Sequence, residues 1–370
     1  MKHQVKLTHF EKMSRSTTAK ASMKLMDRAA KECGKKFPTF TDVLNTKAVG
    51  ELTGRMFNLY GLSEEDEVSY DAASIVASLH IMYQMWGLQK AGKGIFHILP
   101  EMADRLLYTK LNKVPTESIK TPFEFFYISA PPIMQIWNQL SGEHNLTGIY
   151  VCLPPDQPKE DRRMYICGVG EEKSARKIVE LAGGTIRDEV IDDAVTWFYI
   201  VLNKPTADEC LKAFLAKYKN EANNIMGPNY ERTKEMFRFV LNTCLYLTSK
   251  TPDMMKVFND EVEIRKKLKR AKSSGKRKKL ERKLHNVRPS YIIVGPKTEE
   301  EVNKPSEKTG IKITVQTRVR GHGRWQACGI RWSQHKLIWI EPHTRGRYLR
   351  ESKKQYVIKV KPTEEEVSRE

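Results

Sequence analysis

Patterns that mark a metal site or a disulfide framework are missing from this sequence. Its six cysteines, at positions 33, 152, 167, 210, 244 and 328, form no CxxC pair and no zinc-finger spacing. Dense disulfide frameworks are typical of short secreted chains rather than of a chain of 370 residues. We therefore expect reduced thiols that pack as small buried hydrophobic groups, and no metal site.

Long apolar runs and glycine-rich phosphate loops are also missing. The longest apolar stretch, 123–137, is interrupted by a glutamate and two prolines and is shorter than the ~20 residues that span a bilayer. The first residues contain no signal-peptide run, and the glycines match neither a phosphate loop nor a dinucleotide fingerprint. The sequence therefore predicts a cytoplasmic protein with no membrane partner and no cofactor.

Acidic residues are scarce in one part of the chain only. The sequence has 64 Lys and Arg against 45 Asp and Glu, a formal net charge of +19. Residues 1–255 carry 33 basic and 31 acidic side chains, whereas residues 256–361 carry 30 basic and 10 acidic ones. This asymmetry indicates a nearly neutral body joined to a module that binds a polyanion. The alternative is a lysine-rich surface that is only solvated.

Hydrophobic periodicity predicts an α+β protein whose first two regions are 1–120 and 121–255. Region 1–120 is predicted to be helical, because 71–108 has helical spacing that breaks only at Gly92 and Gly94. Region 121–255 is predicted to be mixed α/β. Its expected strands are 123–129, 148–153, 163–168 and 194–203, and its expected helices are 207–219, with Thr206 as N-cap, and 230–247.

The remaining residues predict a basic helical linker over 256–289 and a small basic β-rich module over 290–361. The linker can form two basic helices separated by Ser273, Ser274 and Gly275. The module is predicted to bind nucleic acid. Its expected strands are 291–294, 311–315, 337–340 and 356–360.

Basic and aromatic residues are densest over 316–350, which is the predicted nucleic-acid interface. Arginine forks bind phosphate with two hydrogen bonds, and tryptophan faces stack on bases. Such interleaving suits single-stranded or looped RNA better than a duplex groove. The predicted binding residues are Arg318, Arg320, His322, Arg324, Trp325, Arg331, Lys336, Arg345 and Arg347.

His322, flanked by Arg320 and Arg324, also allows a ribonuclease hypothesis. A histidine titrates in the range that general acid–base catalysis needs, and arginines stabilise the charge that develops on phosphate. The spacing defines no geometry, however, and the same residues serve binding equally well. No catalytic residue is therefore assigned, unless the protein is an enzyme that uses His322.

Two segments resemble a family of proteins encoded by phages and mobile elements, which includes a type V anti-CRISPR protein. The sharper likeness is the run 318–322 leading to Trp325, followed by the strand 336–342. The helix 240–247 and the polar turn after it are similar as well, as is the order of the parts. Family members often place an aromatic residue directly after the histidine, where this chain has Gly323 and Arg324.

The resemblance implies an inhibitor that lowers production of a type V CRISPR nuclease in the cytoplasm of the host bacterial cell. It would act through RNA, the ribosome or the nascent nuclease chain, with Arg318, Arg320, His322 and Trp325 at the matching positions. A ribonuclease-like enzyme and a phage DNA-binding protein are the alternatives. Equal affinity for duplex DNA and single-stranded RNA would favour the DNA-binding protein.

Overall fold

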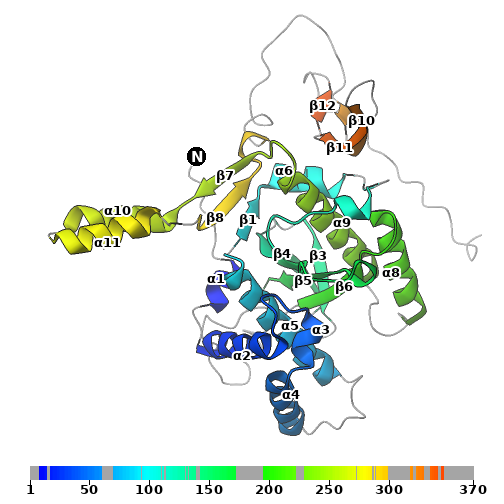
Figure 1. Cartoon of the computed structure of the whole chain (residues 1–370). Helices are drawn as coiled ribbons and strands as arrows, with labels where there is room; N and C mark the ends of the chain where they lie inside the picture. The colour runs from blue at the N-terminus through cyan, green and yellow to red at the C-terminus, as the bar shows by residue number, and fades with distance from the viewer. Residues whose placement is uncertain are drawn as a thin grey trace, which may run out of the picture.

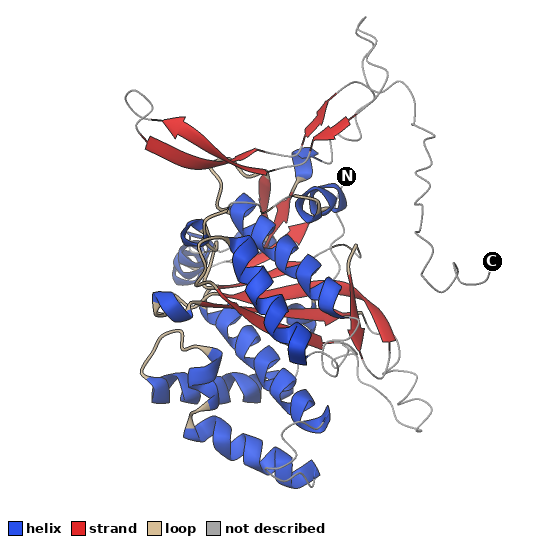
Figure 2. Cartoon of the chain, turned by 90° about the vertical axis from the view of Figure 1, so that its right-hand side faces the viewer, coloured by secondary structure: helices blue, strands red, loops and turns tan. Residues whose placement is uncertain are grey.

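The computed structural model confirms an α+β fold, with helices on both faces of one central sheet (Figure 1, Figure 2). The residues that the structure describes are 8–14, 17–60, 70–92, 94–109, 111, 114–129, 131, 133–138, 142–171, 195–221, 229–271, 273–285, 287, 289–298, 317–319, 322–328, 334–340 and 343–345. No helix among them is long and apolar enough to cross a membrane.

The sheet has eight strands and mixes parallel with antiparallel pairs. Its order is β6-β5-β4-β2-β1-β8-β7, and β3 pairs with β4 off this path. Strand β1 runs parallel to β2 and to β8, and the other pairs are antiparallel. The strands are β1 (Gly94–Ile98), β2 (Phe125–Ser129), β3 (Gln135–Asn138), β4 (Gly142–Cys152), β5 (Arg163–Gly170), β6 (Val195–Val201), β7 (Met254–Val257) and β8 (Tyr291–Val294).

Alternating side chains of the central strands divide the core into two hydrophobic clusters, one on each face. In β2, Phe125 and Tyr127 belong to one cluster, whereas Phe126 and Ile128 belong to the other. This division follows from the two-residue period of a strand. The cluster of Phe125 and Tyr127 is rich in aromatic rings, and the opposite cluster is mainly aliphatic.

The N-terminal helices cover the aromatic face. They are α1 (His9–Met13), α2 (Thr17–Cys33), α3 (Phe40–Leu44), α4 (Lys47–Tyr60) and α5 (Tyr70–Lys90). Helix α3 begins with a capping box, in which Thr39 and Asp42 each accept the other's backbone N–H. The Tyr83 ring of α5 is fully buried, and its hydroxyl donates to the carbonyl oxygen of Pro38 at 2.8 Å.

The aliphatic face is covered by α6 (Pro100–Leu107), α8 (Ala207–Glu221) and α9 (Asn229–Leu247). The hydroxyl of Thr206 accepts the backbone N–H of Glu209 at 3.3 Å, which confirms Thr206 as the N-cap of α8. Helix α9 is tied to α6 by Asn242, whose amide donates to the carbonyl oxygens of Leu106 and Thr109 at 2.8 and 3.0 Å. Two short 3-10 turns complete the body, at Thr116–Ser118 and Lys159–Asp161.

The expected strands and helices of region 121–255 are confirmed, and so are the two basic helices of 256–289. The latter are α10 (Asn259–Arg270) and α11 (Ser274–His285). Five cysteines are free thiols, and all of them except Cys33 are buried, as expected: Cys33, Cys152, Cys167, Cys210 and Cys244. The predicted strands 311–315 and 356–360 lie outside the described residues.

Two expectations about the sheet are corrected by the structure. The helical interpretation of 94–98 is wrong, because these residues form β1 at the centre of the sheet. All five are buried, and a continuous apolar run is typical of a parallel strand covered on both faces. Residues 291–294, expected in the C-terminal module, form β8 of the same sheet. The limits of the four regions themselves stay predictions.

A histidine without hydrogen-bond partners lies in the aromatic cluster. The His80 side chain is 0% exposed, and neither ring nitrogen has a partner among the described residues. Its ring stacks on Trp197 with centroids 4.7 Å apart and meets the edge of Phe40 at 4.7 Å. Burial lowers the pKa of His80 to about 3, and it lowers the pKa of His97 in β1 to about 4. Both rings are therefore neutral parts of the core.

Acidification should destabilise the protein because of these two histidines. When unfolded, His80 binds a proton below its ordinary pKa of 6.5, whereas the folded form stays neutral down to about pH 3. The free energy of unfolding therefore falls as the pH drops from about 6.5 toward 3, with His80 contributing about 2 kcal/mol between pH 7 and 5. Urea unfolding at both pH values should show a smaller loss for His80→Phe. An unchanged loss would contradict this prediction.

Close packing of α5 on the sheet predicts opposite effects for two helical glycines. A Cβ at Gly87 would lie 2.0 Å from the Phe125 ring, so Gly87→Ala should destabilise the protein by about 1–3 kcal/mol. The matched control Gly50→Ala meets nothing within 4 Å in α4 and should stabilise it by up to about 1 kcal/mol. Thermal unfolding of both variants measures the difference. Equal shifts would contradict the packing of α5 on β2.

Candidate nucleic-acid interface

Four short strands carry the described part of the predicted interface. They are β9 (Thr317–Val319), β10 (His322–Cys328), β11 (Gln334–Ile340) and β12 (His343–Arg345). Strands β10 and β11 form an antiparallel hairpin, and β9 pairs antiparallel with β12. The predicted strand 337–340 is therefore confirmed within β11. The pairing of these strands defines which of the predicted binding residues share a face of each ladder.

The register of the β10–β11 hairpin separates the basic residues from the tryptophan. Gln326 lies opposite Lys336, and Arg324 precedes Gln326 by two residues, so Arg324 and Lys336 hold positions on the same face of the ladder. His322 belongs to the same set. Trp325 lies opposite Leu337, at a position of the other face. The hairpin thus offers one basic set of positions and one set that includes the tryptophan.

The second pair places two further predicted residues. Arg318 lies opposite Thr344, and Arg345 lies opposite Thr317. Because Thr317 and Arg318 are successive residues of β9, the two arginines hold positions on opposite faces of this ladder. Arg320, Arg331 and Arg347 lie outside the described residues. Binding of nucleic acid by any of the nine residues stays a prediction.

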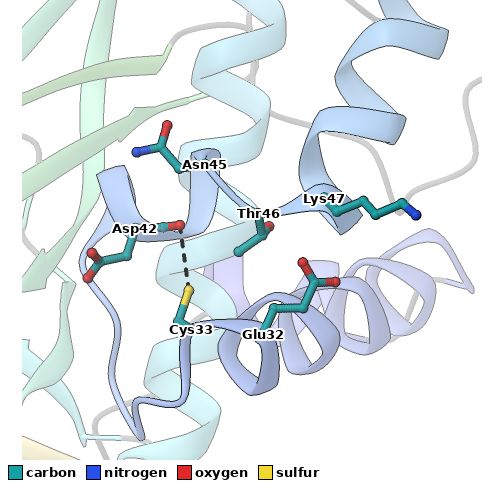
Figure 3. Close-up of a pocket in the computed structure, with 6 residues that line it drawn as sticks. All are labelled: Glu32, Cys33, Asp42, Asn45, Thr46 and Lys47. Carbon is teal, nitrogen blue, oxygen red and sulfur yellow. Dashed lines mark hydrogen bonds between the residues drawn. The ribbon is translucent and has the colours of Figure 1, made fainter.

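A shallow polar depression of about 320 Å³ lies where α2, α3 and α4 meet (Figure 3). It is lined by Glu32, Cys33, Asp42, Asn45, Thr46 and Lys47. The Cys33 thiol donates to the carbonyl oxygen of Asp42 at 3.5 Å, as the dashed line in Figure 3 marks. Burial, and then the nearby Asp42 carboxylate, raise the pKa of this thiol. Cys33 is therefore a protonated thiol rather than an activated nucleophile.

The carboxylates around this depression support the helices. Asp42 forms an ion pair with Lys35 at 2.9 Å and accepts the Thr39 N–H at 2.8 Å. Partial burial raises the pKa of Asp42, but these two interactions outweigh it and lower the pKa overall. The Glu32 carboxylate accepts the N–H of Ala48 in the first turn of α4 at 3.4 Å. Within the described residues, no group of three His, Cys, Asp or Glu side chains is placed to hold a metal ion.

A comparison with known protein families identifies the family of this chain. A model of the AcrVA2-like family, the anti-CRISPR type V subtype A2 family, matches residues 96–343, about two thirds of the chain. The chain belongs to this family. The crystal structure of AcrVA2 is similar at 14% sequence identity and a TM-score of 0.49, and the match covers 90% of this chain and 96% of that one. No curated protein matches.

The AcrVA2-like segment begins within β1 and ends at the first residue of β12. It therefore includes the body of the sheet from β1 onward, both basic helices and the β10–β11 hairpin, whereas α1 to α5 lie outside it. The resemblance inferred from 316–343 is confirmed at the level of the family. From the sequence, the basic run 256–289 was counted in the segment predicted to bind a polyanion and was interpreted as a linker, and no binding residue was assigned to it.

The hairpin register predicts separable effects of its basic and aromatic residues on RNA binding. In the double variant Arg324→Gln and Lys336→Gln, loss of two phosphate contacts should make the slope of log affinity against log salt shallower by about 1–2. Trp325→Ala should cost about 1–3 kcal/mol through lost base stacking and leave the slope unchanged. Fluorescence anisotropy with single-stranded RNA at several salt concentrations measures both quantities. A changed salt slope in Trp325→Ala would contradict the separation.

Proposed function

We propose that this AcrVA2-like protein inhibits type V CRISPR interference by lowering production of the nuclease, through contact with the RNA that is being translated. Membership of an anti-CRISPR type V family supports the target class. The observation that carries the RNA contact is the charge distribution, with 30 basic against 10 acidic residues in 256–361 beside a nearly neutral body. A polyanionic partner is the ligand that such a surface attracts.

Binding of the nascent nuclease chain is the alternative contact within the same function. The neutral residues 1–255 would then recognise the nuclease, and the basic residues would hold the ribosome or its RNA. A near-neutral body and a basic segment in one chain suit this division of labour. Either contact acts on production and not on the finished enzyme, which separates this proposal from direct inhibition of nuclease activity.

Co-expression in bacteria tests the proposal. A type V nuclease and an unrelated reporter are transcribed from identical promoters, with and without this protein, and the amounts of both proteins and both transcripts are measured. We expect nuclease protein to fall several-fold while the reporter stays constant. The variant Arg324→Gln and Lys336→Gln should restore nuclease production. Loss of interference with an unchanged amount of nuclease would overturn the proposal.

The test requires substitutions in the whole chain and not a truncation. Removing the residues after 255 would also remove β8, which lies between β1 and β7 in the central sheet. The loss of β8 leaves backbone N–H and C=O groups of β1 unpaired and would destabilise the body for reasons unrelated to RNA. Substitutions on β10 and β11 leave the eight-stranded sheet intact, so that a changed phenotype reports on binding.

A further inference from the structure

A helical hairpin projects from the body between β7 and β8. Helices α10 and α11 lie side by side and extend away from the sheet, as Figure 1 shows in yellow. Each has 12 residues, which corresponds to a length of about 18 Å. The two helices are joined by three residues, 271–273. We call residues 259–285 the arm.

The arm is held by a thin apolar seam and carries almost no core of its own. Ile264 and Leu268 in α10 and Leu280 and Leu284 in α11 are half-buried, and α11 has no buried residue. The spacing of four residues puts each pair on one side of its helix. The seam uses four of the five aliphatic side chains of the two helices, so no wide apolar face is left to enter a membrane surface.

The arm leaves the sheet at the Val257–Tyr291 end of the β7–β8 pair, and Asp253 closes the opposite end of this pair. The Asp253 carboxylate accepts the backbone N–H groups of Lys297 and Thr298 at 2.8 and 3.0 Å, and its carbonyl oxygen accepts the Gly295 N–H at 2.9 Å. The register of β7 with β8 runs from Met254 opposite Val294 to Val257 opposite Tyr291.

The outer surface of the arm is basic. Its 27 positions include twelve Lys and Arg against four Asp and Glu. Arg265 forms an ion pair with Glu261 at 2.7 Å. Nine other basic side chains are exposed and form no ion pair with the described side chains: Lys267, Lys269, Arg270, Lys276, Arg277, Lys278, Lys279, Arg282 and Lys283.

Helix α11 carries positive charges at positions where they destabilise a helix. Its first turn contains Lys276 and Arg277 and no acidic residue, although the helix dipole favours negative charge at that end. Lys279 and Lys283 are spaced by four residues and repel each other. The basic residues in the last turn of α11 suit the helix dipole, but those in its first turn do not, and such a broken local rule favours a functional surface over a merely solvated one.

We propose that the arm is a docking surface for the phosphate backbone of double-stranded RNA, bound without regard to sequence. The arm contains no Phe, Trp or Tyr and therefore offers no ring for base stacking, which single strands require. Lysine supplies point charges that follow a phosphate row, and a double helix presents such rows densely. The choice of RNA over DNA rests on the proposed function.

The test uses the full chain and a labelled RNA duplex of about 20 base pairs, followed by fluorescence anisotropy between about 50 and 200 mM salt. The arm variant is Lys276→Gln, Lys279→Gln and Lys283→Gln. The control variant, Lys24→Gln, Arg28→Gln and Lys31→Gln, removes the same charge from exposed positions of α2. Glutamine keeps helix propensity close to that of lysine, and circular dichroism verifies the fold of both variants.

We expect the arm variant to lose at least about tenfold in affinity and its salt slope to become shallower by about 2–3, while the control stays within about twofold of the unmodified protein. Equal losses in both variants, or tighter binding of a DNA duplex of the same sequence, would overturn the proposal. Unchanged binding by the arm variant would overturn it and leave the proposed function standing. Conversely, duplex RNA binding that needs the arm in a protein that leaves nuclease production unchanged would refute the proposed function alone.

Discussion

The parallel pairing of β1 with β8 is the interaction on which the architecture depends. It joins residues nearly two hundred positions apart, with Phe96 opposite Ile292 and Ile98 opposite Val294. The Leu99 N–H continues this ladder to the Val294 carbonyl oxygen at 3.0 Å. Parallel strands of this kind are stable only when both faces are covered, and the aromatic and aliphatic clusters supply that cover. The chain after residue 258 is therefore not a detachable unit, because its first strand lies inside the sheet.

The same pairing determines where the basic charge is displayed. Strand β7 joins the sheet only by pairing with β8, and β8 pairs with β1. The position of the arm, which is inserted between β7 and β8, therefore depends on the β1–β8 pair. Gly295, with a φ of +95° and its α-carbon packed close to the Met102 side chain, lets the chain turn directly after β8. A rigid, nearly neutral body thus presents a charged arm that contributes little to the core. Binding energy from such a surface depends on salt and is separable from stability.

The histidines with shifted pKa values and the polar depression near Cys33 both belong to the body of the protein and not to the arm. Two histidines with lowered pKa values, His80 in α5 and His97 in β1, are buried in the body. The one depression described, near Cys33, is built from helix-capping contacts.

Local pattern was enough to predict the α+β class, the strands β2, β4, β5 and β6, the helices α8 to α11 and the Thr206 cap, because periodicity and capping depend on neighbours in sequence. The short strands β3 and β7 were not predicted. Composition also located the basic–aromatic cluster of the candidate site. Strand pairing depends on contacts between residues that are far apart in the sequence. For this reason β1 was mistaken for part of a helical region and β8 for part of the C-terminal module. For the same reason the placing of Arg324 and Lys336 on one face of the hairpin emerged only from the register. The tertiary structure alone decided that the basic helices form a projecting arm, since its direction comes from the β7–β8 pair that carries it.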